Sequence, residues 1–322
     1  MRVLITGAHG FIGTHLTRAL LARDLPLREV VLLDVAPGGE RFASDPRIRV
    51  ETGDASDPAL IAKLVQPGVD SVFALGATLT SQAEVEFARG LEVNMLGVLR
   101  LLEACRQLAQ APKFVFTSSI AAFGGPLPEV VDDDVARTPQ TSYGTAKAIN
   151  ELLINDFSRR NHVDGRALRL PIVLTRPPSN SPTPAISERA AALIREPLAG
   201  RDVSCPWLPE TLVPIASARA VADALLAIHD LPKERFDHNR ALNLHCRSAR
   251  IGELVDAVQN IGTRRSWPRK LGRVTYQPDP ALQRIVDQWP RRFESARARE
   301  LGLCGDSAEA IIDHYIADYL ES

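Results

Sequence analysis

The chain has 322 residues, of which 45% are hydrophobic and 24% are charged. This length and balance predict a folded protein of one large or two modest domains, and they exclude disorder as the dominant state. The 38 Lys and Arg residues against 39 Asp and Glu residues leave a net charge of −1, which argues against a nucleic-acid or membrane-surface partner.

Targeting segments and a metal framework are also not predicted. No uncharged apolar run approaches the ~20 residues of a membrane-spanning helix. The first apolar run, residues 3–6, is too short for a signal peptide. The four cysteines lie 100, 41 and 58 residues apart, a spacing unlike that of metal or disulfide sites. We therefore expect a soluble, cytoplasmic protein without a bound metal.

The first half of the chain alternates between short β-branched runs and stretches with apolar residues at helical spacing. This alternation predicts a mostly parallel sheet covered by helices on both faces. The strands are nearly continuous apolar runs, as burial on both faces requires. The predicted strands are 3–6, 30–34, 48–50, 71–75, 113–117 and 166–170, and the predicted helices are 11–23, 58–65, 84–110 and 142–160.

The composition changes at Pro171. Residues 171–214 hold nine of the 23 prolines, which predicts a loop with short elements. Helical patterns return at 217–229, 251–261 and 306–320. We expect a nucleotide-binding domain over 1–170 and a mainly substrate-binding region over 171–322, partly interleaved with the first.

Two charged segments interrupt these patterns. Five cations fall within ten residues at 264–273, which predicts a solvated loop, with an anion site as the alternative. The three consecutive aspartates at 132–134 likewise predict a solvated turn.

A glycine motif follows the first strand directly. Gly7 allows a tight turn, Gly10 lets the backbone approach a pyrophosphate, and Gly13 lets the helix pack close to the strand. Phe11 and Ile12 open the helix, whose N-terminal N–H groups favour phosphate. The motif predicts a dinucleotide site on a Rossmann-type, doubly wound α/β fold; a tight turn without a ligand is the alternative.

The end of the second strand selects the cofactor. Asp34 lies 21 residues past Gly13, where a carboxylate accepts the adenosine ribose hydroxyls and repels a 2′-phosphate. Residues 35–37 contain no arginine, so the cofactor is predicted to be NAD. After the third strand, Asp54, followed by Ala55, meets the adenine amino group or simply forms a turn.

A tyrosine and a lysine share one face of a predicted helix. Tyr143 and Lys147 are four residues apart, and an ammonium near a phenol lowers the phenol pKa. Tyr143 is therefore a candidate general base. Ser118 and Ser119 lie at the carboxyl end of a predicted strand, the edge where open α/β sheets bind ligands.

Together these motifs resemble the extended short-chain dehydrogenases/reductases, the group of NAD-dependent epimerases and dehydratases. The resemblance rests on the glycine motif, Asp34, residues 117–124 and the Tyr143/Lys147 pair. It implies that Ser119 is the catalytic hydroxyl, that Lys147 binds the nicotinamide ribose, and that Asn94 lies near the active site. It also implies a homodimer, in which helices 84–110 and 142–160 of each subunit form a four-helix bundle.

One departure from the family follows the fourth strand. Where relatives often have His-Leu-Ala-Ala, this chain has Ala-Leu-Gly-Ala at 74–77, so only backbone contacts to the cofactor carry over. The predicted cofactor-binding residues are Gly7, Gly10, Phe11, Ile12, Gly13, Asp34, Asp54, Ala55, Leu75, Gly76, Ala77, Asn94, Thr117, Tyr143, Lys147 and Pro171.

The branch of the family determines the reaction. Dehydratases carry Thr-Asp-Glu at the active-site strand, but Ile120 and Ala121 cannot transfer protons. Segments such as 123–129, 138–145 and 164–171 instead resemble D-erythronate dehydrogenases, which oxidise the C2 hydroxyl of a four-carbon sugar acid with NAD. The alternatives are a nucleotide-sugar epimerase and a non-catalytic dinucleotide-sensing regulator. The predicted substrate-binding residues are Ser81, Ser118, Ser119, Tyr143 and Arg176.

Arg176 is the predicted clamp for the substrate carboxylate, because a carboxylate needs cations or N–H donors. It follows the sixth predicted strand in the proline-rich segment. An arginine that only anchors this loop is the alternative.

Overall fold

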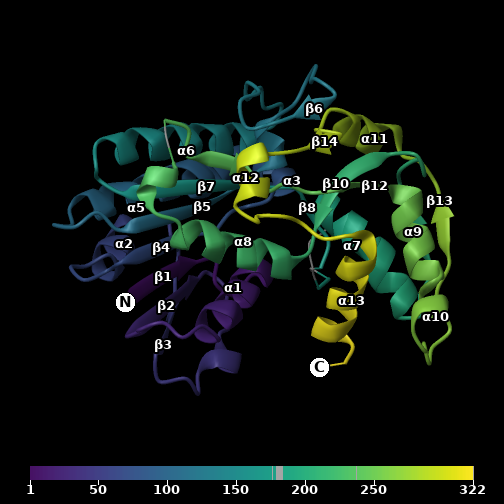
Figure 1. Cartoon of the computed structure of the whole chain (residues 1–322), viewed down its shortest axis with the longest axis horizontal. Helices are drawn as coiled ribbons and strands as arrows, with labels where there is room; N and C mark the ends of the chain where they lie inside the picture. The colour runs from purple at the N-terminus through teal and green to yellow at the C-terminus, as the bar shows by residue number, and fades with distance from the viewer. Residues whose placement is uncertain (176, 179–183, 237, 322) are drawn as a thin grey trace. The chain divides into compact units, whose positions relative to one another are not determined.

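A seven-stranded sheet has the strand order β11-β7-β5-β4-β1-β2-β3 in the computed structural model (Figure 1). β1 pairs with β2 and β4, β2 with β3, and β4 with β5, all in parallel. This order is the doubly wound arrangement, so the predicted α/β fold class is confirmed. The strands are β1 (Arg2–Thr6), β2 (Glu29–Asp34), β3 (Ile48–Thr52), β4 (Ser71–Ala74), β5 (Lys113–Ser119), β7 (Asp164–Leu170) and β11 (Ala241–Asn243).

Helices cover both faces of this sheet. On one face a buried apolar cluster joins the sheet to α2, α5 and α6. On the opposite face, Phe73 stacks on His229 of α8, with ring centres 5.3 Å apart. The helices of this part are α1 (Phe11–Leu21), α2 (Pro58–Leu64), α5 (Gly97–Arg106), α6 (Ser142–Arg159) and α8 (Ala218–Asp230), with short turns η1 (Glu40–Phe42), η3 (Ile120–Ala122) and η4 (Lys233–Arg235).

The long helix predicted over 84–110 is broken. It begins earlier, as α3 (Thr80–Val85), and continues as α4 (Phe87–Leu91), a π-helical turn η2 (Glu92–Leu96) and α5. Glu86 has φ −110° and ψ 62°, which is outside the helical region and ends α3. A π-helical turn is frequent at functional sites, and this one contains Asn94.

The structure describes residues 1–175, 177–178, 184–236 and 238–321. By its internal contacts the chain divides into unit 1 (1–122, 137–169 and 222–242) and unit 2 (123–136, 170–221 and 243–322). The two units are therefore interleaved along the sequence. That unit 2 binds the substrate stays a prediction. Within the described ranges, none of the helices is long and apolar enough to cross a membrane.

Unit 2 has its own apolar core, in which Trp207 is fully buried among residues of α7, α9 and α13. Its strands are β6 (Val130–Val131), β8 (Ile172–Val173), β9 (Val203–Cys205), β10 (Leu212–Ala216), β12 (Ser248–Arg250), β13 (Val274–Tyr276) and β14 (Arg292–Phe293). Its helices are α7 (Ile186–Leu198), α9 (Ile251–Gln259), α10 (Ile261–Arg264), α11 (Pro280–Asp287), α12 (Ala296–Glu300) and α13 (Ala308–Tyr319).

The proline-rich segment contains a longer helix than the short elements predicted there. α7 runs for 13 residues and carries Pro197 in its last turn. No proline interrupts residues 185–196, where apolar residues at helical spacing pack into the core of unit 2. The proline content of the segment therefore led to an underestimate of the helix length, because eight of the nine prolines lie outside α7.

The predicted solvated turn at 132–134 is wrong for its middle residue. Asp133 is buried, and one of its oxygens accepts the Asn243 backbone N–H at 2.7 Å. The other oxygen accepts the Ser295 hydroxyl at 2.6 Å. Partners more than 100 residues away thus remove this carboxylate from water.

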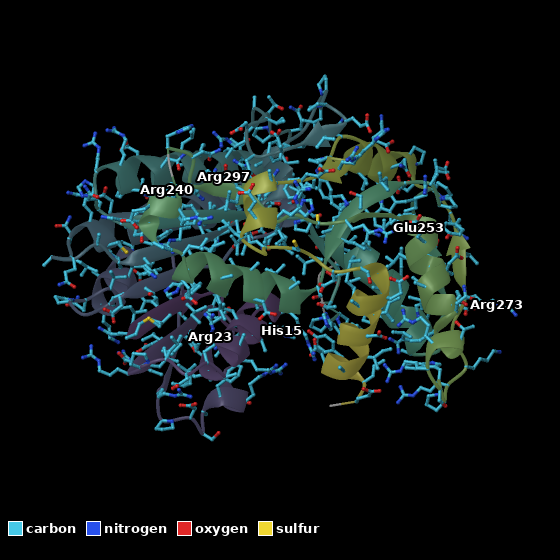
Figure 2. All side chains as sticks on the ribbon, viewed as in Figure 1. His15, Arg23, Arg240, Glu253, Arg273 and Arg297 are labelled. Atoms are coloured by element: carbon cyan, nitrogen blue, oxygen red, sulfur yellow. The ribbon has the colours of Figure 1, made fainter. Side chains whose placement is uncertain are left out.

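The basic run at 264–273 is partly neutralised by α13. Arg264 and Arg265 both form ion pairs with Asp313, at 2.6 Å and 3.9 Å. Lys270 and Arg273 line a hollow of unit 2, and Figure 2 shows Arg273 at the surface. Exposed ion pairs of this kind are what the predicted solvated loop implies.

Candidate active site

The glycine motif adopts a turn that only glycine allows. Gly7 has a φ of +67°, and a Cβ on it would lie 2.7 Å from the backbone of Gly76. A Cβ on Gly13 would lie 2.5 Å from the Gly7 carbonyl oxygen, so α1 packs directly on the turn. Gly10 is the N-cap residue of α1 and provides no side-chain cap. The N-terminus of a helix favours a phosphate, and the cofactor contacts predicted for Phe11 and Ile12 stay predictions.

The residues predicted after β4 lie beside this turn. The Leu75 N–H donates to the Thr6 carbonyl at 3.2 Å, which continues the pairing of β4 with β1. Gly76 is the residue in contact with Gly7. Leu75, Gly76 and Ala77 thus form the other wall of the glycine turn.

Asp34 lies at the carboxyl end of β2, next to the glycine turn. One carboxylate oxygen accepts the backbone N–H of His9 at 2.9 Å, and the other accepts that of Ala36 at 3.1 Å. These bonds fix the carboxylate, and each oxygen keeps a second acceptor site. The glycine cradle, the open helix N-terminus and this carboxylate together fit the pyrophosphate and adenosine ribose of NAD.

This geometry predicts a strong preference for NAD over NADP. A 2′-phosphate placed against Asp34 costs several kcal/mol by order of magnitude, so kcat/KM with NADP should be at least ~10²-fold lower. Initial rates with both cofactors measure the ratio. Asp34→Asn removes the charge and should reduce the ratio of kcat/KM with NAD to kcat/KM with NADP. Equal kcat/KM values with both cofactors for the unmodified protein would contradict the prediction.

Asp54 has protein partners of its own. One oxygen accepts the N–H and the hydroxyl of Ser56, at 2.8 and 2.7 Å, and the other forms an ion pair with Arg89 at 2.5 Å. Although burial alone would raise it, the pKa of Asp54 is lowered by these bonds. The geometry favours the turn-forming alternative over the adenine contact, and for Ala55, the next residue, the cofactor role stays a prediction.

The catalytic residues predicted from sequence come together at the junction of β5 and α6. Thr141 caps α6, its hydroxyl accepting the Gly144 N–H at 3.0 Å. The Tyr143 side chain is hydrogen-bonded to Ser119. The Ser119 oxygen also accepts the Ala121 N–H at 3.1 Å, which orients the hydroxyl. A serine and a tyrosine 24 residues apart are thus in direct contact.

Lys147 lies beneath this pair. Its Nζ donates to the Thr117 carbonyl at 2.7 Å and lies 5.3 Å from the centre of the Tyr143 ring and 4.6 Å from that of Phe116. Thr117 is itself buried, and its hydroxyl donates to the Ala74 carbonyl at 3.3 Å. The lysine is therefore fixed on the same helical face as the tyrosine, as its spacing predicts.

Burial dominates the pKa values of both groups. It raises the pKa of Tyr143 to about 12, against the hydrogen bond from Ser119, and it lowers the pKa of Lys147 to about 7, against the charge of Glu151. The expected lowering of the tyrosine pKa is not found in the protein alone. The physical reason is that the ammonium lies by the ring face and bonds to a carbonyl, not to the phenol oxygen.

Asn94 connects three elements around the site. Its side-chain oxygen accepts the Thr78 N–H at 2.9 Å, and its amide nitrogen donates to the Thr78 carbonyl at 3.0 Å. Its own carbonyl accepts the Asn150 amide of α6 at 2.7 Å. Asn94 therefore holds the segment after β4 against the π-helical turn and α6.

The residues predicted to bind the substrate or to follow the sixth strand differ in how exposed they are. Ser81 lies in α3 and is half-buried. Ser118 is buried, and its hydroxyl donates to Glu151, so a substrate contact through it would require breaking that bond. Pro171 is buried directly after β7. Arg176 lies outside the described residues.

Sequence reasoning missed the buried charges around Lys147. Glu151, Arg169 and Arg137 form an ion-pair cluster one helical turn beyond the lysine. The spacing of four between Lys147 and Glu151 was a signal that could have pointed to it. In the part of the chain that the structure describes, no three His, Cys, Asp or Glu side chains are grouped so as to hold a metal ion.

Comparisons with known proteins identify the family of the chain. The NAD dependent epimerase/dehydratase family matches residues 3–244. A protein of Cupriavidus necator named D-erythronate dehydrogenase is 40% identical, over 100% of this chain and 98% of its own. One of the same name from Haemophilus influenzae is 34% identical, over 95% and 96%. The solved nucleoside-diphosphate-sugar epimerase from Agrobacterium tumefaciens superposes with a TM-score of 0.88 at 34% identity, covering 100% of this chain and 95% of its own.

Proposed function

Because the chain belongs to the NAD dependent epimerase/dehydratase family, we propose that it oxidises the C2 hydroxyl of D-erythronate to give 2-dehydro-D-erythronate. The observation that carries this proposal is the likeness, over nearly the full length of both chains, to two proteins named D-erythronate dehydrogenase. The Ser119, Tyr143 and Lys147 arrangement supplies the groups that an alcohol oxidation needs.

In the proposed reaction the Ser119 hydroxyl, oriented by the Ala121 N–H, binds the substrate C2 oxygen. Tyr143 takes the hydroxyl proton while the C2 hydrogen leaves with its electron pair, so that a C=O bond forms. Bound NAD supplies the hydride acceptor and a positive charge. Lys147 binds the nicotinamide ribose, and the glycine turn and Asp34 hold the pyrophosphate and the adenosine ribose.

The protonation states set a pH requirement. Tyr143 acts as a base only after it loses its proton, and its pKa of about 12 keeps it neutral near pH 7 in the protein alone. The oxidation rate should therefore rise with pH. Arg176 remains the proposed clamp for the carboxylate, since one arginine suffices for a single carboxylate.

The test is an assay of purified protein with NAD and D-erythronate, followed by NADH absorbance. A panel of four- to six-carbon aldonates and UDP-hexoses defines the substrate class. No reduction of NAD with any aldonate, together with interconversion of a UDP-hexose, would reverse the assignment in favour of an epimerase. That alternative is favoured by the name of the Agrobacterium structure. The regulator alternative requires a degenerate catalytic set, but Ser119, Tyr143 and Lys147 are all present.

The proposal includes a homodimer formed through α4 and α6, which pack against each other. Val85, Phe87 and Leu152 are 77%, 61% and 55% exposed on α3, α4 and α6, which contact one another. Exposed apolar side chains on adjoining helices are typical of a surface that a partner covers, and a second copy is the partner that the family resemblance implies.

We therefore expect light scattering at micromolar concentration to give a dimer, and Phe87→Glu to give a monomer. The control is Leu208→Glu, an exposed apolar residue of unit 2 (39% exposed), which should remain dimeric. A monomeric unmodified protein would contradict this prediction.

A cytoplasmic location is also part of the proposal. All four cysteines, Cys105, Cys205, Cys246 and Cys304, are free thiols. Reduced cysteines are the usual state in the cytoplasm.

A further inference from the structure

A buried carboxylate lies one helical turn beyond Lys147. Both oxygens of Glu151 accept hydrogen bonds from the Arg169 guanidinium, each at 2.9 Å, and both side chains are fully buried. Arg137, 23% exposed, reaches the same carboxylate at 3.1 Å. An ion pair removed from water in this way adds little net stability compared with apolar residues, which suggests a role beyond packing.

The carboxylate belongs to the same row of contacts as the candidate base. Three consecutive residues at the end of β5 each bond to a different side chain of α6: Thr117 to Lys147, Ser118 to Glu151 and Ser119 to Tyr143. The three α6 residues are four apart, so they line one face of the helix. A shift of the carboxylate would therefore disturb the lysine and the tyrosine beside it.

We propose that Glu151 is a positioning residue for the reaction: held by Arg169 and Ser118, its carboxylate keeps Lys147 charged and aligned beneath Tyr143. This inference rests on the proposed function, in which Tyr143 is the general base. It extends that function to a residue that touches neither substrate nor cofactor in the proposed reaction.

Charge is the property through which Glu151 acts. Lys147 is buried between two aromatic rings, an environment that disfavours its ammonium, and the charge of Glu151 favours it. Two cations, Arg169 and Arg137, face the carboxylate and offset part of its effect. Arg137 is partly exposed, so its removal changes the charge of the cluster without opening the buried pair.

Two substitutions that remove opposite charges test the proposal through the pH dependence of kcat. Glu151→Gln removes the negative charge that favours the Lys147 ammonium, so the phenolate of Tyr143 is stabilised less and the rise of kcat with pH should move to higher pH. At pH 7, kcat should fall about tenfold or more, because a neutral lysine does not stabilise the phenolate. Arg137→Gln removes a positive charge that opposes the effect of Glu151 on Lys147, so the rise should move to lower pH. Glu151→Asp keeps the charge and should keep the position of the rise.

A purely structural role would lower kcat without moving the pH profile. Shifts of the same sign in the two charge variants, or no shift in either, would overturn the proposal. Glu151→Gln leaves Arg169 buried without its partner and can fail to fold. In that case the Arg137→Gln profile decides alone, and the absence of a shift to lower pH would overturn the proposal.

A second measurement needs neither substrate nor cofactor. The pKa of Lys147 is about 7 in the fold against 10.5 as its ordinary value, so the unfolded chain binds more protons between these values. The contribution of Lys147 to stability therefore rises with pH across this window. Glu151→Gln should extend the window to lower pH, and Arg137→Gln should shorten it. Thermal unfolding midpoints across this pH range measure the effect.

Lys147→Met provides the reference for this measurement. In that background the pH-dependent differences between the variants should disappear, since the titrating group is gone. If they persist, the charge of Glu151 does not act on Lys147 and the proposal fails. If they disappear but no aldonate is oxidised, the proposed function fails while the coupling of Glu151 to Lys147 stands.

Discussion

Replacing Tyr143 with phenylalanine should lower turnover of D-erythronate by ~10²-fold or more and leave NADH binding nearly unchanged. The substitution keeps the ring that lies over Lys147. It removes the oxygen that is proposed to receive the substrate proton and that is hydrogen-bonded to Ser119. The kcat from NADH absorbance and the dissociation constant from fluorescence titration measure the two effects separately.

Tyr276→Phe serves as the matched control, because Tyr276 lies in β13 of unit 2 and is partly exposed. It should keep the turnover of the unmodified protein. A nearly fully active Tyr143→Phe enzyme would show that another group is the base. Loss of NADH binding in that variant would show that the tyrosine hydroxyl is needed for cofactor binding and not only for proton transfer.

Gly144→Ala should damage both stability and catalysis. A Cβ at this position would lie 1.9 Å from the Ala121 carbonyl oxygen, so α6 would have to move away from the turn after Ser119. Overpacking of this kind costs on the order of 1–3 kcal/mol. Because the shift separates Tyr143 from Ser119, kcat should fall by ~10²-fold. Calorimetric unfolding and the NADH assay measure the two losses.

The control for this prediction is Gly262→Ala in α10, where a Cβ would meet nothing within 4 Å. Alanine favours a helix over glycine by about 1 kcal/mol, so this variant should be neutral or slightly stabilised. If Gly144→Ala behaves like the control, the close packing of α6 on η3 is not required for the site.

Local patterns were sufficient for the framework of the site. The glycine turn, the carboxylate of Asp34 and the shared face of Tyr143 and Lys147 follow from residue type and spacing over short stretches. The contact between Ser119 and Tyr143 bridges 24 residues, and family resemblance was needed to expect it. The strand ends differ from the prediction by at most two residues, because the apolar runs that define them are continuous.

Features that depend on distant partners could not be read from the sequence. Asp133 is buried because it bonds to Ser295, 162 residues away. Glu151 and Arg169 lie on different elements, and only the packing of α6 on the sheet joins them. The break at Glu86 replaces one predicted helix by several, although its apolar spacing looks continuous. In each case tertiary contacts, and not local preference, decide the structure.

The path of the chain between Ser119 and Tyr143 has a consequence for how such an enzyme can change during evolution. Residues 123–136 belong to unit 2, and the chain returns to unit 1 at Arg137. Thr117, Ser118 and Ser119 precede the segment 123–136, and the α6 residues that they contact follow it. These contacts therefore hold Tyr143 in place whatever the length of that segment. Insertions or substitutions in the segment 123–136 can therefore accumulate without changing the contact between Ser119 and Tyr143.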